Sequence, residues 1–387
     1  MGIDPFEGIV VIGGGAWGTA LAIAAERTGR PTRLWIRERD ALERVRQDRI
    51  NPFLPAHRLP ESIAADDDLA RLLTPRRATD LVLVVVPSQH LRSTVRRLAP
   101  LLAPGTPLVI CSKGIERDSG LLMSQVASAE LPRWPLAVLS GPSFADEVAA
   151  GQPTAITIAD VRGSQAELAA PDGLAARIAV TLGSARFRPY LSDDAIGVEI
   201  GGAVKNVLAI ACGIAAGVGL GSNPRAALIT RGLAEIKRLT AALGGNPDTT
   251  TGLAGIGDLV LTCSSEQSRN FSFGKQLGTG VSAERALANR LDVVEGAVNA
   301  RSVLALAKRV GVEMPICETV DAIVHRGAPI DEAIERLLTR PIRAEATTLE
   351  DRIRLAHPAI ASVADVSATE QAANSGSAGH RIQVTAP

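Results

Sequence analysis

The sequence predicts an α/β domain built on a doubly wound, mostly parallel sheet, followed by an all-α domain. Short, continuous apolar runs recur up to about residue 190, as expected of strands buried on both faces, and helical or loop material separates them. Beyond "PYLSDD" (189–194) these runs stop, and long segments rich in Ala, Leu and Gly with a period near 3.6 replace them. We therefore expect a sheet domain over residues 1–192 and a helical domain over residues 193–345.

The elements of the sheet domain follow one another at short intervals. A first strand is predicted in "GIVVI" (8–12), the helical "TALAIAAERTG" (19–29) ends at Gly29, and "TRLWIR" (32–37) follows as a second strand. Four further strands are expected over residues 81–86, 107–112, 136–140 and 154–159. Helices of the second domain are expected over residues 196–218, 225–243, 281–290, 296–310, 315–326 and 330–338.

The C-terminal extension, residues 346–387, is poor in large apolar side chains. Such a segment cannot bury enough apolar surface to compensate for the entropy that it would lose on ordering. We therefore expect this extension to be largely disordered.

Composition and charge exclude several classes of protein. The 387-residue chain carries a formal net charge of 0, whereas nucleic-acid and membrane-surface proteins need a basic excess. The four cysteines are far apart in the sequence, which favours buried free thiols in a reducing cytoplasm. The five histidines lack the spacing of a metal site. The longest uncharged apolar run is too short to span a bilayer. We expect a soluble cytoplasmic protein with no metal, no nucleic-acid partner and no membrane insertion.

The glycines of "GIVVIGGGAWG" (8–18) fit the pattern GxGxxG between a strand and a helix. Gly13 permits the tight turn, Gly15 lets backbone amides approach a pyrophosphate, and Gly18 lets the helix pack close to the strand. The helix N-terminus adds the positive end of its dipole. The pattern therefore predicts a dinucleotide site, and the alternative is a tight glycine turn without a ligand.

The end of the second predicted strand bears on the choice of dinucleotide. An acidic residue there accepts from the ribose 2′-hydroxyl of NAD, whereas an arginine suits the 2′-phosphate of NADP. "WIRERD" (35–40) puts Arg37 first and Glu38 next. This order favours NADP(H), while Glu38 keeps NAD(H) possible, and a solvated charged turn is the third reading.

Ligands of an open α/β sheet bind outside the carboxyl ends of its strands, which directs attention to the loops that follow them. "KG" (113–114) follows one predicted strand and places Lys113 at the cofactor edge, where an anionic substrate would be held. "GPSFADE" (141–147) follows the next, and Ser143 and the amides near Gly141 and Ala145 are candidate donors to phosphate or carbonyl oxygens. An exposed loop lysine and a plain turn are the structural alternatives.

Lys205 stands inside the almost wholly apolar "IGGAVKNVLAIACGI" (200–214), where burying an ammonium costs several kcal/mol unless it is compensated. On a helix it shares a face with Gly201, Gly202 and Ala209, whose small side chains we expect to leave room for another molecule. A partly buried ammonium fits the reduction of a ketone, because it stabilises the developing oxyanion and gives up a proton. The alternative is a lysine that snorkels from a helix end.

Two further stretches supply candidate partners. In "GLAGIGDLVLTCSSEQSRN" (252–270), Asp258 within reach of Lys205 would orient it, and Arg269 with Asn270 would clamp a phosphate bidentately. "VVEG" (293–296) offers Glu295, whose role the local pattern leaves open.

Long motifs carry a resemblance to a known family. The chain is similar to bacterial NAD(P)-dependent glycerol-3-phosphate dehydrogenases from about residue 8 to residue 340. The resemblance implies an N-terminal Rossmann domain, a helical C-terminal domain and a homodimer. It also implies the reversible reduction of dihydroxyacetone phosphate to sn-glycerol 3-phosphate, which feeds glycerophospholipid synthesis. The motifs are GGGAWGTALA, KGIE, GPSFADE, GVEIGGAVKNVLAIACG, NPRAALITRGLAE, GLAGIGDLVLTCSSEQSRN, VVEG and EMPICE.

The resemblance also implies roles for individual residues. Lys205 falls on the family's proton donor and acceptor, and the extension beyond about residue 345 has no counterpart. The substrate-binding positions are Lys113, Gly141, Ser143, Lys205, Asp258, Ser268, Arg269 and Asn270. The cofactor positions are Gly13, Gly15, Ala16, Trp17, Gly18, Arg37, Phe53 (in "NPFLP", where an aromatic is typical), Lys113, Ala145, Arg269, Val293 and Glu295.

Two other functions fit the same architecture. A hydroxyacid or ketopantoate reductase would use the same pair of domains with a carboxylate substrate, and fold alone does not separate them. A redox sensor would bind the dinucleotide without chemistry.

Overall fold

The computed structural model describes residues 3–163, 173–288 and 293–339, and the statements below concern these residues. The extension over residues 346–387 and the expected domain end at residue 345 lie outside them. Residues 1–330 form one compact unit that contains both the sheet and the large helices, and a second unit begins at Asp331. All but the first residue of α16 (Ile330–Leu338) belong to the second unit. This helix has acidic residues in its first turn and Arg336 in its last, which suits the helix dipole.

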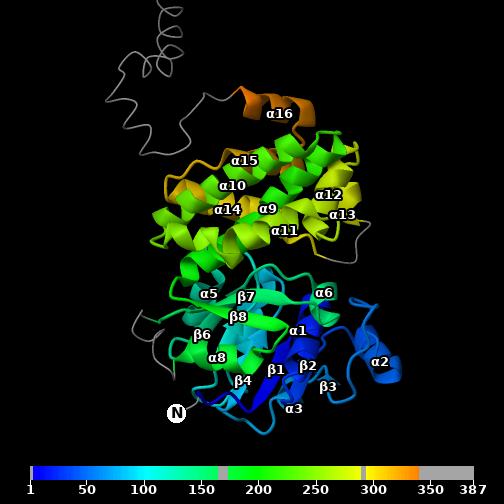
Figure 1. Cartoon of the computed structure of the whole chain (residues 1–387), viewed down its shortest axis with the longest axis vertical. Coiled ribbons are helices and arrows are strands. Elements are labelled where there is room, and N and C mark those ends of the chain that lie inside the picture. Colours follow the sequence, from blue (N-terminus) through cyan, green and yellow to red (C-terminus); the bar gives the residue numbers. More distant parts are fainter. Residues whose placement is uncertain (1–2, 164–172, 289–292, 340–387) are drawn as a thin grey trace, which may run out of the picture. The chain divides into compact units, whose positions relative to one another are not determined.

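The strands of the described residues form one eight-stranded sheet in the order β3-β2-β1-β4-β5-β6-β7-β8 (Figure 1). Neighbours run parallel, except that β7 runs antiparallel to β6. Because the chain proceeds from β1 first to one side and then to the other, the predicted doubly wound sheet is confirmed. The strands are β1 (Gly8–Ile12), β2 (Thr32–Trp35), β3 (Ala64–Asp66), β4 (Asp80–Val84), β5 (Leu108–Ile110), β6 (Leu136–Ser140), β7 (Thr154–Asp160) and β8 (Phe187–Ser192).

The central strand β1 shows why these strands are continuously apolar. Ile9 and Val11 belong to the core on one face of the sheet, and Val10 and Ile12 belong to the core on the other. Since successive side chains of a strand point to opposite faces, a strand covered on both sides must be apolar throughout. The first face is covered by α1 (Ala16–Glu26), α2 (Arg39–Asp48), α6 (Ala145–Ala149) and α8 (Leu174–Leu182), and the second by α3 (Leu69–Leu72), α4 (Leu91–Leu98) and α5 (Met123–Glu130).

Several elements differ from the sequence-based expectation. β3 was not predicted, because its three residues contain no apolar run. β8 falls where the pattern indicated the end of the sheet, because most side chains of this edge strand are exposed or half-buried. α11 (Asp258–Ser264) and α12 (Arg269–Gly278) were also missed, since serine and glycine interrupt their apolar pattern.

α9 (Ala195–Gly217) is the central helix of the helical region, and α10, α11, α12, α14 and α15 pack against it (Figure 1). By length and composition alone α9 would suit a membrane span, but 83% of its apolar window is buried inside the protein, as in a core helix. The other elements there are α10 (Ser222–Ala242), α13 (Ala283–Ala288), α14 (Glu295–Arg309), α15 (Pro315–Arg326) and the short turns η2 (Pro247–Thr251) and η3 (Leu253–Gly257); η1 (Ser88–His90) precedes α4.

Glycines allow α9 and α12 to cross with their backbones in contact. A Cβ on Gly213 would lie 2.1 Å from the carbonyl oxygen of Phe271, and a Cβ on Gly274 would lie 2.1 Å from that of Ile210. Gly217 and Gly278, one turn further along each helix, are equally tight. This crossing fixes the position of the N-terminus of α12 along α9.

Replacing Gly274 by alanine therefore tests the crossing. The added methyl group must push the two backbones apart, and we expect a loss of about 1–3 kcal/mol in the free energy of unfolding, measured by chemical denaturation. Gly221→Ala is a control for an added methyl group in open space, because a Cβ there meets nothing within 4 Å among the described residues. A Gly274→Ala protein as stable as the wild type would contradict the packing described.

Candidate active site

The loops that follow β4, β5 and β6 meet at one edge of the sheet, because these strands run parallel. The loop after β5 carries Lys113, whose ammonium donates to the carbonyl oxygen of Gly141, 3.2 Å away in the loop after β6. α9, which carries Lys205, packs against β6. The sheet edge and the central helix thus bring three predicted site residues into one region.

A single carboxylate joins the two lysines. Asp258 Oδ2 accepts a hydrogen bond from Lys113 Nζ at 2.7 Å, and Oδ1 accepts one from Lys205 Nζ at 2.5 Å. Asp258 is 1% exposed and Lys205 is 7% exposed. Charges buried so deeply are tolerated because they compensate one another and satisfy further hydrogen bonds. Lys205 also donates to the hydroxyl oxygen of Thr262 at 3.0 Å.

Burial changes the ionisation of this cluster. Removal from water lowers the pKa of the Lys205 ammonium to about 8; the Asp258 carboxylate opposes this shift and the Lys113 ammonium adds to it. Burial by itself raises the pKa of Asp258, but the ammonium groups of Lys113 and Lys205 outweigh it and hold that pKa below its usual range. The cluster thus keeps a charged carboxylate beside an amine that exchanges its proton not far above neutral pH.

The backbone before Asp258 makes a tight turn that packs on α9. η3 is a π-helical turn that leads directly into α11, and such turns are frequent at functional sites. A Cβ on Gly255 would lie 1.9 Å from the carbonyl oxygen of Thr250, and a Cβ on Gly201 would lie 2.4 Å from that of Ala254. Glycine at both positions therefore lets η3 approach α9 closely enough for Asp258 to meet a lysine of that helix.

The expectation that the small residues beside Lys205 leave room for another molecule is wrong for the two glycines. Gly201 contacts η3, as described above. A Cβ on Gly202 would lie 2.9 Å from the hydroxyl of Ser140 and 3.4 Å from Cγ of Lys113. The protein itself fills this space, and the glycines bring the two lysine-bearing segments together.

The N-terminus of α12 is tied to the same part of α9. Asn270 Nδ2 donates to Oδ1 of Asn206, the residue after Lys205, at 2.9 Å, and Oδ1 of Asn270 accepts from the backbone N–H of Gly296 at 2.9 Å. Ser268 caps α12, its hydroxyl oxygen accepting from the N–H of Phe271 at 3.2 Å. Ser268 and Asn270 therefore hold in place a helix N-terminus, a feature that attracts anions.

Glu295 begins α14 and binds the loop after β4. Its carboxylate accepts from the hydroxyl of Ser88 at 2.8 Å and from the N–H of Ser88 at 3.3 Å. Burial raises the pKa of Glu295, while Ser88 and the guanidinium of Arg269 act in the opposite direction. The charge of Arg269 thus acts on the Glu295 carboxylate. Val293, two residues before Glu295, is 46% exposed.

The glycine loop has the shape of a dinucleotide cradle. Gly13 has φ +135°, and a Cβ there would lie 2.2 Å from the carbonyl oxygen of Val85. A Cβ on Gly18 would lie 1.8 Å from the carbonyl oxygen of Gly13, so this glycine brings α1 against the turn. Gly15 differs: a Cβ there would meet nothing within 4 Å, so no protein neighbour requires glycine. The space beside Gly15 thus fits the expectation that a ligand approaches the backbone there.

Other features of α1 agree with this reading. Gly15 occupies the N-cap without any side-chain hydrogen bond to the first turn, which leaves the terminal amides of α1, beginning with Ala16, available to a phosphate. Within the described residues, the indole N–H of Trp17 is buried and has no hydrogen-bond partner. The residues present therefore fit a bound dinucleotide.

The remaining predicted residues lie around this cradle. Arg37 is 59% exposed at its side chain and donates twice to Oε1 of Glu38, at 2.9 and 2.6 Å. Phe53 packs half-buried on the core; its N–H donates to Asn51, whose amide in turn donates to the Gly14 carbonyl oxygen at 2.8 Å. Ser143 lies in the loop after β6, and its hydroxyl donates to the Gly141 carbonyl oxygen at 2.9 Å. Ala145 is the first residue of α6, the helix that follows this loop.

Sequence reasoning missed four residues of this region. Thr262 stands one turn after Asp258, a spacing that could have indicated a shared helix face. Asn206 follows Lys205 in the same apolar stretch, and nothing in the local pattern assigns it a partner. Ser88 lies in "PSQH" (87–90), a loop after a predicted strand where ligands are expected to bind, but no local pattern links it to Glu295. Asn299 gives no local signal, since its Nδ2 donates to the Lys113 carbonyl oxygen, at 3.2 Å, across a long sequence separation.

Asp258→Asn tests the shared carboxylate. The substitution leaves two buried or half-buried ammonium groups without their counter-charge, and we expect a loss of about 3 kcal/mol in the free energy of unfolding at neutral pH. Asp248→Asn is the control, because that side chain is 87% exposed and its loss should change stability by less than about 0.5 kcal/mol. Equal stability of the two variants would show that the buried ion pairs do not form.

Comparison with known proteins follows the same division of the chain. Family models described as the N-terminus and the C-terminus of NAD-dependent glycerol-3-phosphate dehydrogenase match residues 8–166 and 194–335. The chain is 50% identical to glycerol-3-phosphate dehydrogenase [NAD(P)+] of Rhodospirillum rubrum over 87% of its length and 93% of the relative's. It is 50% identical to the Caulobacter vibrioides enzyme over 88% and 99% of the two lengths.

Solved structures give the same result. The crystal structure of glycerol-3-phosphate dehydrogenase from Coxiella burnetii matches 87% of this chain and 100% of its own with a TM-score of 0.80 and 42% identity. Both halves of the chain, in sequence and in fold, thus lead to one family. The chain belongs to the NAD-dependent glycerol-3-phosphate dehydrogenases.

Proposed function

We propose that this protein catalyses the reversible, NAD(P)H-dependent reduction of dihydroxyacetone phosphate to sn-glycerol 3-phosphate. The observation that carries the proposal is the buried cluster in which Asp258 holds the ammonium groups of Lys113 and Lys205. The names of relatives that are 50% identical support the substrate and the use of either nicotinamide.

In the proposed reaction Lys205 is the acid. When bound, the nicotinamide would supply the hydride that reduces the carbonyl carbon, and the carbonyl oxygen would gain negative charge. The Lys205 ammonium stabilises that charge and transfers its proton from Nζ to the oxygen, leaving a neutral amine that burial favours. In the reverse direction the neutral amine accepts the hydroxyl proton. Asp258 and Thr262 fix the position of Nζ throughout.

The residues that would hold the phosphate and the cofactor lie at two helix N-termini. The substrate phosphate fits the N-terminus of α12 with Arg269, whose guanidinium suits bidentate contact, and Lys113, Gly141 and Ser143 would line the same site. The cofactor pyrophosphate fits the N-terminus of α1 at Gly15. Arg37 would contact the 2′-phosphate, so we propose that NADP(H) is preferred and that Glu38 permits NAD(H).

The organisation of the protein is also part of the proposal. We place the boundary between the cofactor domain and the substrate domain at residues 192–193, between β8 and α9.

We further propose a homodimer in the cytoplasm. Buried, free cysteines suit a reducing compartment, and Leu220 and Val260 give the helical region exposed apolar side chains for a second copy to cover.

Substrate turnover tests the function directly. The purified protein should oxidise NADPH when dihydroxyacetone phosphate is added and should leave 2-keto acids such as ketopantoate unreduced. Turnover of the keto acid instead would support the reductases with carboxylate substrates, and dinucleotide binding without any turnover would support a sensor.

Lys205→Ala tests the acid. We expect kcat for dihydroxyacetone phosphate reduction to fall by about 10²–10⁴, while the dissociation constant for NADPH stays within about twofold. Lys237→Ala, at a 39% exposed lysine of α10, is the matched control and should keep full activity. Unchanged turnover of the Lys205 variant would reject this mechanism.

A further inference from the structure

The segment between β5 and α5, residues 111–122, carries Lys113 and is held from both sides. On the side of α14, Asn299 donates to the carbonyl oxygen of Lys113 at 3.2 Å, and Arg309 donates to those of Ser119 and Gly120 at 2.9 and 2.8 Å. Among the described residues, no hydrogen bond from α14 reaches residues 115–118, which are held instead by side chains of the sheet domain. We call residues 113–120 the lysine loop.

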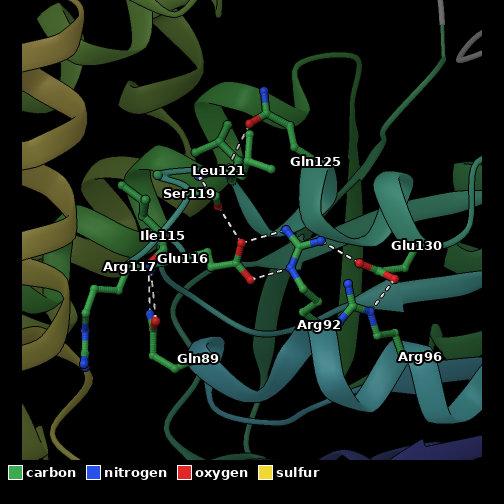
Figure 2. A network of polar contacts seen from close by, with 12 residues as sticks. Gln89, Arg92, Arg96, Ile115, Glu116, Arg117, Ser119, Leu121, Gln125 and Glu130 are labelled. Carbon is green, nitrogen blue, oxygen red and sulfur yellow. Dashed lines mark hydrogen bonds and ion pairs between the residues drawn. The ribbon is translucent and has the colours of Figure 1, made fainter.

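Gln89, in η1 next to Ser88, holds the backbone of the lysine loop. Its amide group donates to the carbonyl oxygen of Ile115 at 2.9 Å, and its amide oxygen accepts from the N–H of Arg117 at 3.0 Å (Figure 2). Gly114 lies where a Cβ would be 2.5 Å from the Ser88 hydroxyl, so the loop packs directly on η1. A displacement of this part of the loop therefore reaches Lys113.

Arg92, on α4, binds the side chain of Glu116 in the same loop. Its Nε and Nη2 donate to the two carboxylate oxygens of Glu116 at 2.8 and 2.7 Å, and its Nη1 donates to Glu130 at the end of α5 at 2.6 Å (Figure 2). The hydroxyl of Ser119 donates to the same carboxylate of Glu116 at 2.5 Å. One guanidinium thus connects α4, the lysine loop and α5. Its bidentate contact with Glu116 is one that a lysine ammonium cannot reproduce.

We propose that Arg92 is a positioning residue, which fixes the lysine loop through Glu116 so that the Lys113 ammonium reaches Asp258 and the substrate. The inference rests on the proposed function, since it concerns the same reaction. Arg92 acts through Lys113 and touches neither substrate nor cofactor.

Charge explains why the loop needs this residue. Glu116 and Glu130 both face Arg92, and hydrogen bonds from the arginines hold the pKa of each carboxyl below its usual range, so both stay ionised. Without Arg92 these two carboxylates would repel each other across the gap between the loop and α5. Glu116, three residues from Lys113, would also be free to attract its ammonium away from Asp258.

Arg96 provides a matched control on the same helix. Its Nε donates to Glu130 at 2.8 Å, as Arg92 does, but no hydrogen bond or ion pair between Arg96 and the lysine loop is found among the described residues. The charge of Arg96 also lowers the pKa of Glu116, but as a smaller cause than the hydrogen bonds from Arg92. Removing Arg96 therefore deletes one arginine–glutamate pair and leaves the hydrogen bonds to Glu116 in place.

The test is a double-mutant cycle between Arg92 and Lys113, read as kcat/KM for dihydroxyacetone phosphate at saturating NADPH. Arg92→Ala should lower kcat/KM by about tenfold to a hundredfold, while Arg96→Ala changes it by less than about twofold. In a Lys113→Ala background, Arg92→Ala should cost less than about twofold, because its effect passes through the missing lysine. Equal losses in both backgrounds, or no loss in the wild-type background, would overturn the proposal.

Two further measurements keep the outcome decisive. If Arg92→Ala does not fold, Arg92→Lys replaces it, with a smaller loss that must vanish in the same way in the Lys113→Ala background. Amide hydrogen exchange should show faster exchange in residues 113–120 for the Arg92 variant and no change for Arg96→Ala; unchanged exchange would overturn the proposal without reference to activity. A wild-type protein that fails to reduce dihydroxyacetone phosphate would instead refute the proposed function.

Discussion

The carboxylate of Asp258 is the constraint on which the rest of the site depends. It is almost fully buried and binds two ammonium groups from different parts of the fold, Lys113 from the edge of the sheet and Lys205 from the central helix α9. A buried charge of this kind is stable only while both partners stay in place. The ion pairs therefore tie the geometry of the active site to the way the sheet and the helices pack.

Several local features of the chain serve this meeting point. The π-helical turn η3 delivers Asp258, and glycine at positions 201 and 202 allows η3 and the Lys113 side chain to approach α9. Burial in turn lowers the pKa of the Lys205 amine to about 8, which is the property that the proposed reaction requires of its acid. Arginine, which stays protonated at any physiological pH, would hold the same position without being able to give up its proton.

The sequence indicated individual residues better than the links between them. Lys205 could be selected because it interrupts an apolar helix, and Lys113 because it follows a predicted strand at the edge where ligands bind. The pairing of Asp258 with Lys205 was anticipated, but its simultaneous contact with Lys113 was not, since 145 residues separate those two positions and only the packed fold brings them together. Glycines 201 and 202 were misread for the same reason: a small residue leaves space, and the sequence alone does not say whether protein or ligand fills it. Nothing in the local sequence pattern links Arg92 to Glu116, because 24 residues separate them and only the packing of α4 against the lysine loop brings them together.

The ionisation of Lys205 is the most direct test of this account. The rate of hydride transfer to dihydroxyacetone phosphate can be measured in single turnovers with enzyme-bound NADPH as a function of pH. If the ammonium form is the acid, as proposed, the rate should be constant at low pH and should fall about tenfold per pH unit above roughly pH 8. Oxidation of glycerol 3-phosphate, which would need the neutral amine, should rise through the same range. A profile that is flat up to the ordinary lysine value of 10.5 would show that the Asp258 cluster does not tune the catalytic amine.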